Sequence, residues 1–140
     1  APGAHGANRT GRVFTGDSSG DWLYKALHKA GLATIPTSTS ANDGQELIDT
    51  RILCAVRCAP PDNKPSTEEK ATCAPFFENE LELIAPTVRS FVALGSFGWQ
   101  VLIKSLKLQG HKVPTTKFGH GATIKYAHNG VNYLQIISSA

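Results

Sequence analysis

The spacing of apolar positions divides the first part of the chain into a loop, a helix and a second loop. Residues 1–17 contain several glycines and no apolar periodicity, which predicts a long ordered loop. A helix is expected from Ser18 to Gly31, because Ser18 or Ser19 can cap its start and a glycine ends it. Its inward stripe is predicted to consist of Trp22, Leu23, Ala26, Leu27 and Ala30. The polar stretch 36–44 predicts a surface loop.

Apolar runs in the rest of the chain predict strands and one more amphipathic helix. Strands are expected at residues 51–56, 88–94, 122–126 and 131–137. The last two flank Asn129–Gly130, a strong hairpin signal, and His128 beside this turn is expected at the surface. The helix is expected over residues 97–106, with Trp99, Leu102, Ile103 and Leu106 facing inward.

Between the first two predicted strands, an irregular loop precedes a helix. Pro60–Pro61 prevent regular structure in this loop. Ser66 and Glu69 have the spacing of a capping box, which predicts a helix start. Pro75 is expected to break or kink this helix, so that two helical segments form and Cys73 lies at the bend.

The order of these elements predicts a single α/β domain over residues 1–140 with a mainly parallel sheet. This length is sufficient for one hydrophobic core. Glycine-rich loops of this kind usually follow a strand, so we expect a strand before residue 1 and a truncated sequence. Ligands of such sheets bind at the carboxyl ends of the strands.

Composition narrows the class of protein only modestly. Apolar residues make up 41% and charged residues 18%, as in ordinary soluble globular proteins. No apolar run approaches the roughly 18 residues of a membrane helix, so no membrane partner is expected. A net charge of +3 is compatible with a polyanionic partner without requiring one. Three cysteines, an odd number, favour a reducing compartment, which predicts a cytoplasmic protein.

Phe14 and Asp17 are the candidate functional side chains of the first loop. The loop matches neither a dinucleotide-binding nor a nucleoside-triphosphate-binding glycine motif. Phe14 either packs beneath its own loop or forms an aromatic platform for a flat ligand such as a base. Asp17 is a candidate N-cap for the following helix, a role compatible with a functional one. Asp21, one helical turn further on, is expected to face solvent.

The cysteines alone are a weak metal signal. Cys58 precedes a proline-rich loop and Cys73 lies in the next helix. Buried free thiols are the more common arrangement, and a four-cysteine cluster needs two more ligands. Cys54 is poorly placed for a metal because it lies within a predicted buried strand.

Three segments resemble one known family. Residues 57–73, RCAPPDNKPSTEEKATC, resemble the cysteine motif of the iron–sulfur uracil-DNA glycosylase superfamily. Residues 1–17, APGAHGANRTGRVFTGD, resemble the first motif of its family 5 (type B) branch, and residues 92–95, VALG, match the family's strand after the second helix. Family 4 relatives carry an Asn that reads the uracil edge where this chain has Cys54, which also favours family 5.

The resemblance implies a fold and a cofactor. The fold would be a three-layer α/β/α sandwich, present here without its first strand, its N-terminal cysteine pair and its C-terminal histidine loop. The cofactor would be a structural [4Fe–4S] cluster, with Cys58 and Cys73 as two of its four ligands.

The resemblance also implies a reaction and a set of site residues. The enzyme would be a monofunctional DNA-repair glycosylase of bacterial or archaeal type, hydrolysing the N-glycosidic bond of uracil and of other deaminated bases such as hypoxanthine. Phe14 would stack on the extruded base, and Asp17 would stabilise positive charge on the sugar or orient water. The remaining base-binding residues would be Pro2, Gly3, His5 and Cys54, and possible DNA-binding residues are Arg9, Arg12, Lys64 and His120.

The expected partner is double- or single-stranded DNA containing a deaminated base, bound by a monomer. These 140 residues by themselves are expected to be inactive, because the implied histidine loop is missing. Three alternatives stay open. They are a noncatalytic nucleic-acid-binding module on the same scaffold, a uracil-specific family 4-type glycosylase, and a small-molecule-binding α/β domain.

Overall fold

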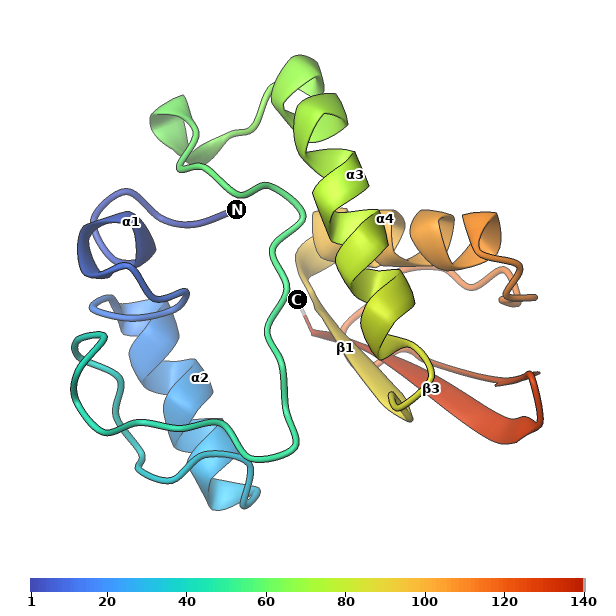
Figure 1. Ribbon diagram of the computed structural model, residues 1–140, viewed down its shortest axis with the longest axis horizontal. Helices are drawn as coiled ribbons and strands as arrows, with labels where there is room; N and C mark the ends of the chain where they lie inside the picture. Colours follow the sequence, from blue (N-terminus) through green and yellow to red (C-terminus); the bar gives the residue numbers. More distant parts are fainter. Residues whose placement is uncertain (140) are drawn as a thin grey trace. The chain divides into compact units, whose positions relative to one another are not determined.

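The computed structural model describes the backbone of residues 1–139 and the side chains of residues 1–130, 136 and 137 (Figure 1). The chain divides into two compact units, Ala1–Phe77 and Glu78–Ala140, so the single domain expected from the sequence stays a prediction. Among the described residues, no helix combines the length and apolar content needed to cross a membrane. The elements in chain order are α1 (Ala7–Thr10), α2 (Ser18–Lys29), the 3-10 turn η1 (Pro61–Asn63), α3 (Thr67–Ile84), β1 (Ser90–Leu94), α4 (Gly95–Leu108), β2 (Thr123–His128) and β3 (Val131–Ser139).

Helix α2 forms where expected but buries a different stripe. Gly20 and Tyr24 are buried and Leu27 is half-buried. Each of these residues lies about one helical turn after the one before it, so all three are on the same face of the helix. Trp22 is 65% exposed, so its predicted inward position was wrong. Ala26 and Ala30 are exposed as well. The inward face follows Gly20 because the preceding loop crosses the first turn of the helix there.

The predicted buried strand at residues 51–56 is absent, and only part of the segment is buried. Cys54 and Val56 are buried, yet the segment is irregular. A strand requires a hydrogen-bonded neighbour, and the described sheet consists of β1, β3 and β2 alone. Apolar character in this segment therefore indicated burial without indicating the backbone conformation.

Helix α3 confirms the capping box and contradicts the predicted break. The Ser66 amide donates to Glu69 Oε2 (2.7 Å), and the Glu69 amide donates to Ser66 Oγ (3.1 Å). The helix then continues through Pro75 as one element. Cys73 therefore lies within a helix and is not at the junction of two segments.

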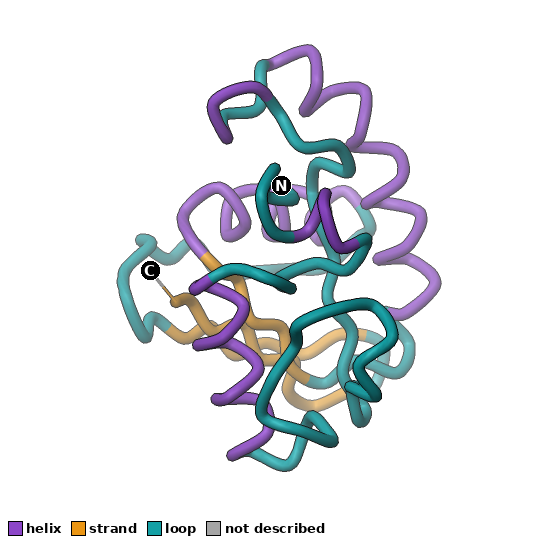
Figure 2. Tube along the Cα trace, turned by 90° about the vertical axis from the view of Figure 1, so that its left-hand side faces the viewer, coloured by secondary structure: helices purple, strands orange, loops and turns teal. Residues whose placement is uncertain are grey.

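The second unit contains a three-stranded sheet in the order β1-β3-β2 (Figure 2). Strands β2 and β3 form the predicted antiparallel hairpin, and β1 pairs with β3 in parallel. The described sheet is thus mixed, where a mainly parallel one was expected. Register brings Phe91, Ile136 and Ile124 side by side in the core. The α/β fold class is confirmed.

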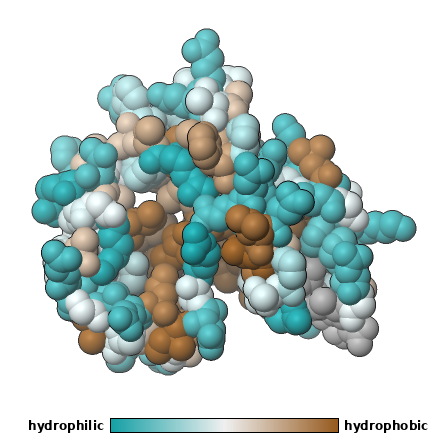
Figure 3. Space-filling model, viewed as in Figure 1, coloured by the Kyte–Doolittle hydropathy of each residue, from teal (hydrophilic) through white to brown (hydrophobic). Residues whose placement is uncertain are grey.

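Helix α4 packs its apolar side against this sheet. It begins at Gly95, two residues earlier than predicted, and buries Trp99, Leu102 and Leu106 as expected. Ile103 is half-buried. Several large apolar side chains stay exposed, and brown patches are visible on the face shown in Figure 3. They are Trp22, Ile48, Phe76, Leu83, Val92, Leu94 and Leu108.

A buried histidine in the second unit was not anticipated from the sequence. His111 is 5% exposed, and its Nδ1 lies 2.9 Å from the hydroxyl of Tyr126. Its ring stacks on that of His128, with ring centroids 3.6 Å apart and planes at 13°. His128 is therefore half-buried, not at the surface as predicted. Burial, together with the neighbouring His128, lowers the pKa of His111, and burial raises the pKa of Tyr126 to about 12.

Stability is expected to fall as the pH drops below the ordinary histidine pKa of 6.5. The folded state lowers the pKa of His111, so the unfolded state binds more protons in this range and acid favours unfolding. Urea unfolding between about pH 7.5 and 5 measures the effect. His111→Phe should flatten this dependence, whereas His5→Gln, at an exposed position, should leave it unchanged. An unaltered pH slope in the His111 variant would contradict the explanation.

Candidate functional site

The first loop holds Phe14 in an unusual backbone conformation. Its φ of 53° lies in the left-handed region, which bulky side chains rarely adopt. The carbonyl of Phe14 lies directly against Gly20 in the first turn of α2. A Cβ atom at position 20 would overlap this carbonyl, with its carbon only 2.5 Å away. The loop thus reaches the helix through a contact that only glycine permits, and the Phe14 ring stays half-exposed.

One carboxylate oxygen of Asp17 caps a helix, and the other has no described hydrogen-bond donor. Its Oδ1 accepts a hydrogen bond from the Gly20 amide (2.7 Å), which confirms Asp17 as the N-cap of α2. Ser18 and Ser19, the other expected caps, lie within the helix instead.

Asp17 Oδ2 faces the glycine-rich loop, because a Cβ atom on Gly6 would lie 2.8 Å from the Asp17 Cγ. A Cβ atom on Gly3 would lie 3.7 Å from Oδ2. Within the described residues, no ion pair engages this half-exposed carboxylate.

Gly20 is the common neighbour of the Phe14 backbone and the Asp17 side chain. A Cβ atom there would meet the Phe14 carbonyl and would also lie 3.2 Å from Asp17 Oδ1. The two ends of the segment 14–17 are therefore both held at the start of α2, Phe14 through its main-chain carbonyl and Asp17 through its carboxylate. The N-terminus of a helix favours negative charge, which suits a carboxylate at this position. The sequence alone indicated the two candidate residues but not the glycine at which both are held.

Arg12 has a structural role in this arrangement. Its guanidinium donates to Ser38 Oγ (3.1 Å), to the Ala41 carbonyl (3.0 Å) and to Asp43 Oδ1 (2.8 Å). This guanidinium, together with amides that include that of Gln45, holds the pKa of Asp43 well below its usual range. A side chain engaged in this way is poorly disposed to contact phosphate, so the predicted DNA-binding role of Arg12 receives no support.

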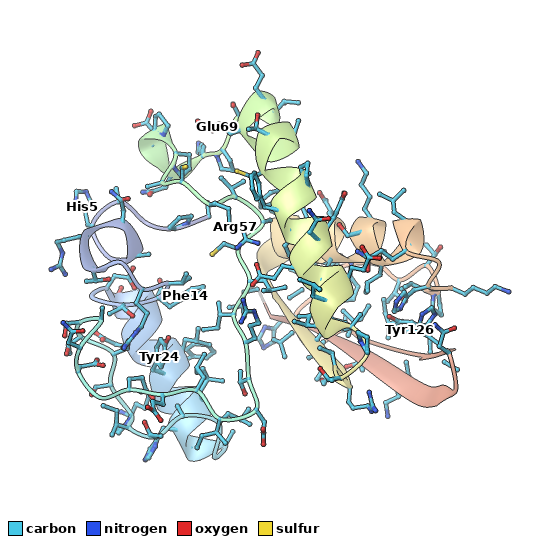
Figure 4. All side chains as sticks on the ribbon, viewed as in Figure 1. His5, Phe14, Tyr24, Arg57, Glu69 and Tyr126 are labelled. Carbon is cyan, nitrogen blue, oxygen red and sulfur yellow. The ribbon has the colours of Figure 1, made fainter. Side chains whose placement is uncertain are left out.

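Other predicted residues of the first loop lie around its short helix α1. Pro2 is half-buried, and the Gly3 carbonyl accepts from the Asn8 amide (2.9 Å). His5 is exposed, and its carbonyl accepts from Arg9 Nε (2.8 Å). In Figure 4, His5 lies beside α1 and Phe14 near the start of α2, so the two side chains are apart. The hydrogen bond from Arg9 means that the His5 carbonyl already has a partner within the loop.

The cysteine motif folds back on itself. The amide of Arg57 donates to Cys73 Sγ (3.5 Å), which brings the residue before Cys58 against the second cysteine. The loop between them turns through Asp62 and Asn63, both with left-handed φ values. Cys73 is buried, and Cys58 is exposed. Among the described residues, no group of three or more metal-ligating side chains forms.

Lys64 and His120 are both exposed but belong to different units. Lys64 follows the turn η1 in the first unit, and His120 precedes β2 in the second. Cys54 is buried in the irregular segment of the first unit. The residues missed by sequence reasoning are Gly6, Thr15, Gly20, Ser38 and Asp43. No spacing rule could have identified them, because each acts through a contact with another segment or through the absence of a side chain.

Comparison with known proteins gives a consistent family. Residues 1–138 match the family model of the Uracil DNA glycosylase superfamily. The chain is 51% identical over 121 residues to a type-5 uracil-DNA glycosylase of Mycobacterium tuberculosis, covering 86% of this chain and 44% of that protein. It is 49% identical over 122 residues to a type-5 enzyme of Thermus thermophilus, covering 87% and 53%.

A type-4 uracil-DNA glycosylase of Thermotoga maritima is less similar, at 32% identity over 111 residues, covering 79% of this chain and 47% of that protein. The chain spans about half the length of the curated relatives it matches. With the family model covering nearly every residue and type-5 relatives more similar than the type-4 relative, the chain belongs to the uracil-DNA glycosylase superfamily.

Proposed function

We propose that the protein excises uracil from DNA by hydrolysing the N-glycosidic bond. The observation that carries this proposal is the arrangement at the start of α2. The backbone carbonyl of the half-exposed Phe14 and the Asp17 carboxylate both lie against Gly20, and Asp17 Oδ2 faces the glycine-rich loop without a described hydrogen-bond donor. An aromatic ring and a carboxylate oxygen without a described donor, carried by the same short segment 14–17, suit a flat base attached to a sugar that gains positive charge.

Each side chain has a distinct part in the proposed reaction. Extruding the nucleotide costs a few kcal/mol, and stacking on an aromatic ring returns about 1–3 kcal/mol per base. Phe14 would provide this surface. As the bond to the base breaks, the sugar becomes oxocarbenium-like, and the Asp17 anion would stabilise it or orient the attacking water. Because Oδ1 is held by the Gly20 amide, the carboxylate is oriented before the substrate arrives.

The proposed substrate range includes hypoxanthine as well as uracil. Cys54 is buried in the first unit, at the position where the uracil-specific pattern has an Asn. A thiol is a weak donor and acceptor, so it imposes little selection by hydrogen bonding. A small, weakly polar side chain also leaves more room for a purine than an amide does.

Alkali treatment of DNA incubated with the protein tests this proposal. The protein, expressed from its complete gene, is incubated with duplexes that carry one uracil, one hypoxanthine or neither. Strand cleavage at both damaged bases supports the proposal, and cleavage at uracil alone favours a family 4-type specificity. Salt-sensitive binding without abasic product would instead indicate a noncatalytic nucleic-acid-binding module.

We also propose that Cys58 and Cys73 are two of four ligands of a [4Fe–4S] cluster. The hydrogen bond from the Arg57 amide to Cys73 Sγ supports this, because amide donors to ligand sulfurs are typical of such sites. Cys58 is exposed, so its sulfur is accessible to iron. The described residues do not provide the remaining ligands. Such a cluster would supply a structural link between the loop before α3 and the helix itself.

Cys58→Ser and Cys73→Ser are each expected to lose most of the bound iron. A hydroxyl replaces the soft thiolate that the cluster requires. Iron analysis and the brown absorbance of the purified protein measure the loss. Cys54→Ser is the matched control, since Cys54 and Cys73 are both 9% exposed and only Cys73 is a proposed ligand. Equal iron content in all three variants would contradict the assignment.

A further inference from the structure

Ser38 connects to the loop of Phe14 and Asp17 through three hydrogen bonds. It lies in the polar stretch 36–44, which was predicted to be a surface loop, but it is fully buried. Its Oγ lies 2.6 Å from Thr15 Oγ1 and accepts from Arg12 Nη1 at 3.1 Å. Its carbonyl accepts from the Gly16 amide at 3.3 Å. Ser38, from a different segment, thus contacts residues that come before and after Phe14 in the sequence.

The donors and acceptors of this network have one consistent direction. Arg12 can only donate, so the Ser38 hydroxyl accepts from it. Either hydroxyl could donate in the Ser38–Thr15 hydrogen bond, and Ser38 is the donor when the single Thr15 hydroxyl proton is used on the Val13 carbonyl. The Thr15 hydroxyl in turn donates to the Val13 carbonyl (3.2 Å). Thr15 is fully buried as well. Each hydroxyl is satisfied, and a buried, fully satisfied network favours one conformation of the segment it joins.

Arg12 is itself held in place by Asp43, which lies in the same polar stretch as Ser38. The Arg12–Asp43 ion pair (2.8 Å) fixes the guanidinium that donates to Ser38. Residues 12, 15 and 16 are therefore attached to the stretch 36–44, and Phe14 lies between them. The left-handed backbone at Phe14 is unfavourable for a phenylalanine, so it persists only while its neighbours are held.

We propose that Ser38 is a positioning residue that keeps Phe14 in the conformation needed to stack on the extruded base. The proposal rests on the uracil-excision function proposed above. Ser38 does not touch the substrate in this scheme. It acts through Arg12, Thr15 and Gly16, which set the backbone on both sides of the ring.

Ser38→Ala is expected to lower the single-turnover rate of uracil excision by about 10- to 100-fold, because a small misplacement of a binding group is costly in rate. The midpoint of thermal unfolding should fall by only a few degrees. Ser40→Ala, at an exposed position of the same stretch, is the matched control and should keep the wild-type rate. Thr15→Val should reproduce the loss, and Thr15→Ser, which keeps the hydroxyl, should restore the rate. The Thr15 variants also serve if Ser38→Ala does not fold.

A Phe14→Ala background separates positioning from a general loss of stability. There, Ser38→Ala should cause little further loss of rate, while its effect on the unfolding midpoint should persist. Rate losses that multiply in the double variant would overturn the role of Ser38 while leaving the excision function intact. Absence of excision by the unaltered protein would count against the excision function instead.

Amide hydrogen exchange tests the same contact without catalysis. Ser38→Ala should increase exchange at residues 12–17, and Ser40→Ala should not. Unchanged protection of these amides in Ser38→Ala would overturn the proposal even for a protein without excision activity.

Discussion

Asp17→Asn is expected to reduce the rate of uracil excision by about 100- to 1000-fold with little change in stability. The substitution removes the negative charge that would stabilise the positive charge developing on the sugar. It keeps the shape of the side chain and an Oδ1 atom that can accept from the Gly20 amide. Asn is as good an N-cap as Asp, so α2 should still begin at the same residue.

Single-turnover kinetics and thermal unfolding of three variants separate the two roles of Asp17. Asp21→Asn removes an exposed acid from the first turn of the same helix and should keep the rate. Asp17→Ala removes both charge and cap, so it should lose the rate and also about 1 kcal/mol of stability. If Asp17→Asn and Asp21→Asn excise uracil equally well, the carboxylate has no part in the reaction.

Gly20→Ala is expected to destabilise the protein by about 3 kcal/mol, lowering the midpoint of thermal unfolding by roughly 10 °C. The added Cβ would overlap the Phe14 carbonyl, which is backbone and cannot swing aside as a side chain can. To relieve this overlap, either the loop carrying Phe14 must move away from α2 or the first turn of α2 must shift. Since the same contact brings Phe14 and Asp17 together, excision should fall together with stability.

Gly98→Ala is the matched control for this effect. Gly98 also lies within a helix, α4, and a Cβ atom there would meet nothing within 4 Å. Alanine should therefore stabilise that helix by about 0.5–1 kcal/mol, through the ordinary advantage of alanine over glycine. The two substitutions are chemically identical, so stability changes of opposite sign would show that the contact with the Phe14 carbonyl causes the loss at position 20. A gain of stability at both positions would refute the close approach of loop and helix.

Local signals in the sequence predicted the features that depend on neighbours a few residues apart. The capping box of Ser66 and Glu69, the N-cap at Asp17 and the hairpin at Asn129–Gly130 all formed as expected. The helix after β1 began within two residues of its predicted start. Long continuous motifs also indicated the superfamily, because the loops that carry Phe14, Asp17 and the two cysteines are each continuous in sequence.

Contacts between distant segments decided the rest. Whether residues 51–56 form a strand depends on a hydrogen-bonded neighbour, and apolar character alone does not supply one. The inward face of α2 depends on the loop that crosses Gly20, so Trp22 faces outward despite its size. The stacking of His111 on His128 joins a loop to a strand, and neither residue indicates it by spacing.

The candidate site shows the same division between local and distant causes. The sequence alone determined that Phe14 and Asp17 share one loop and that Asp17 begins a helix. Only the tertiary structure gave Arg12 its partners Ser38 and Asp43, 26 and 31 residues away, and buried Ser38. The physical reason is that caps and turns are satisfied within a few residues of the chain, whereas a buried polar side chain takes whichever partner the folded chain brings to it.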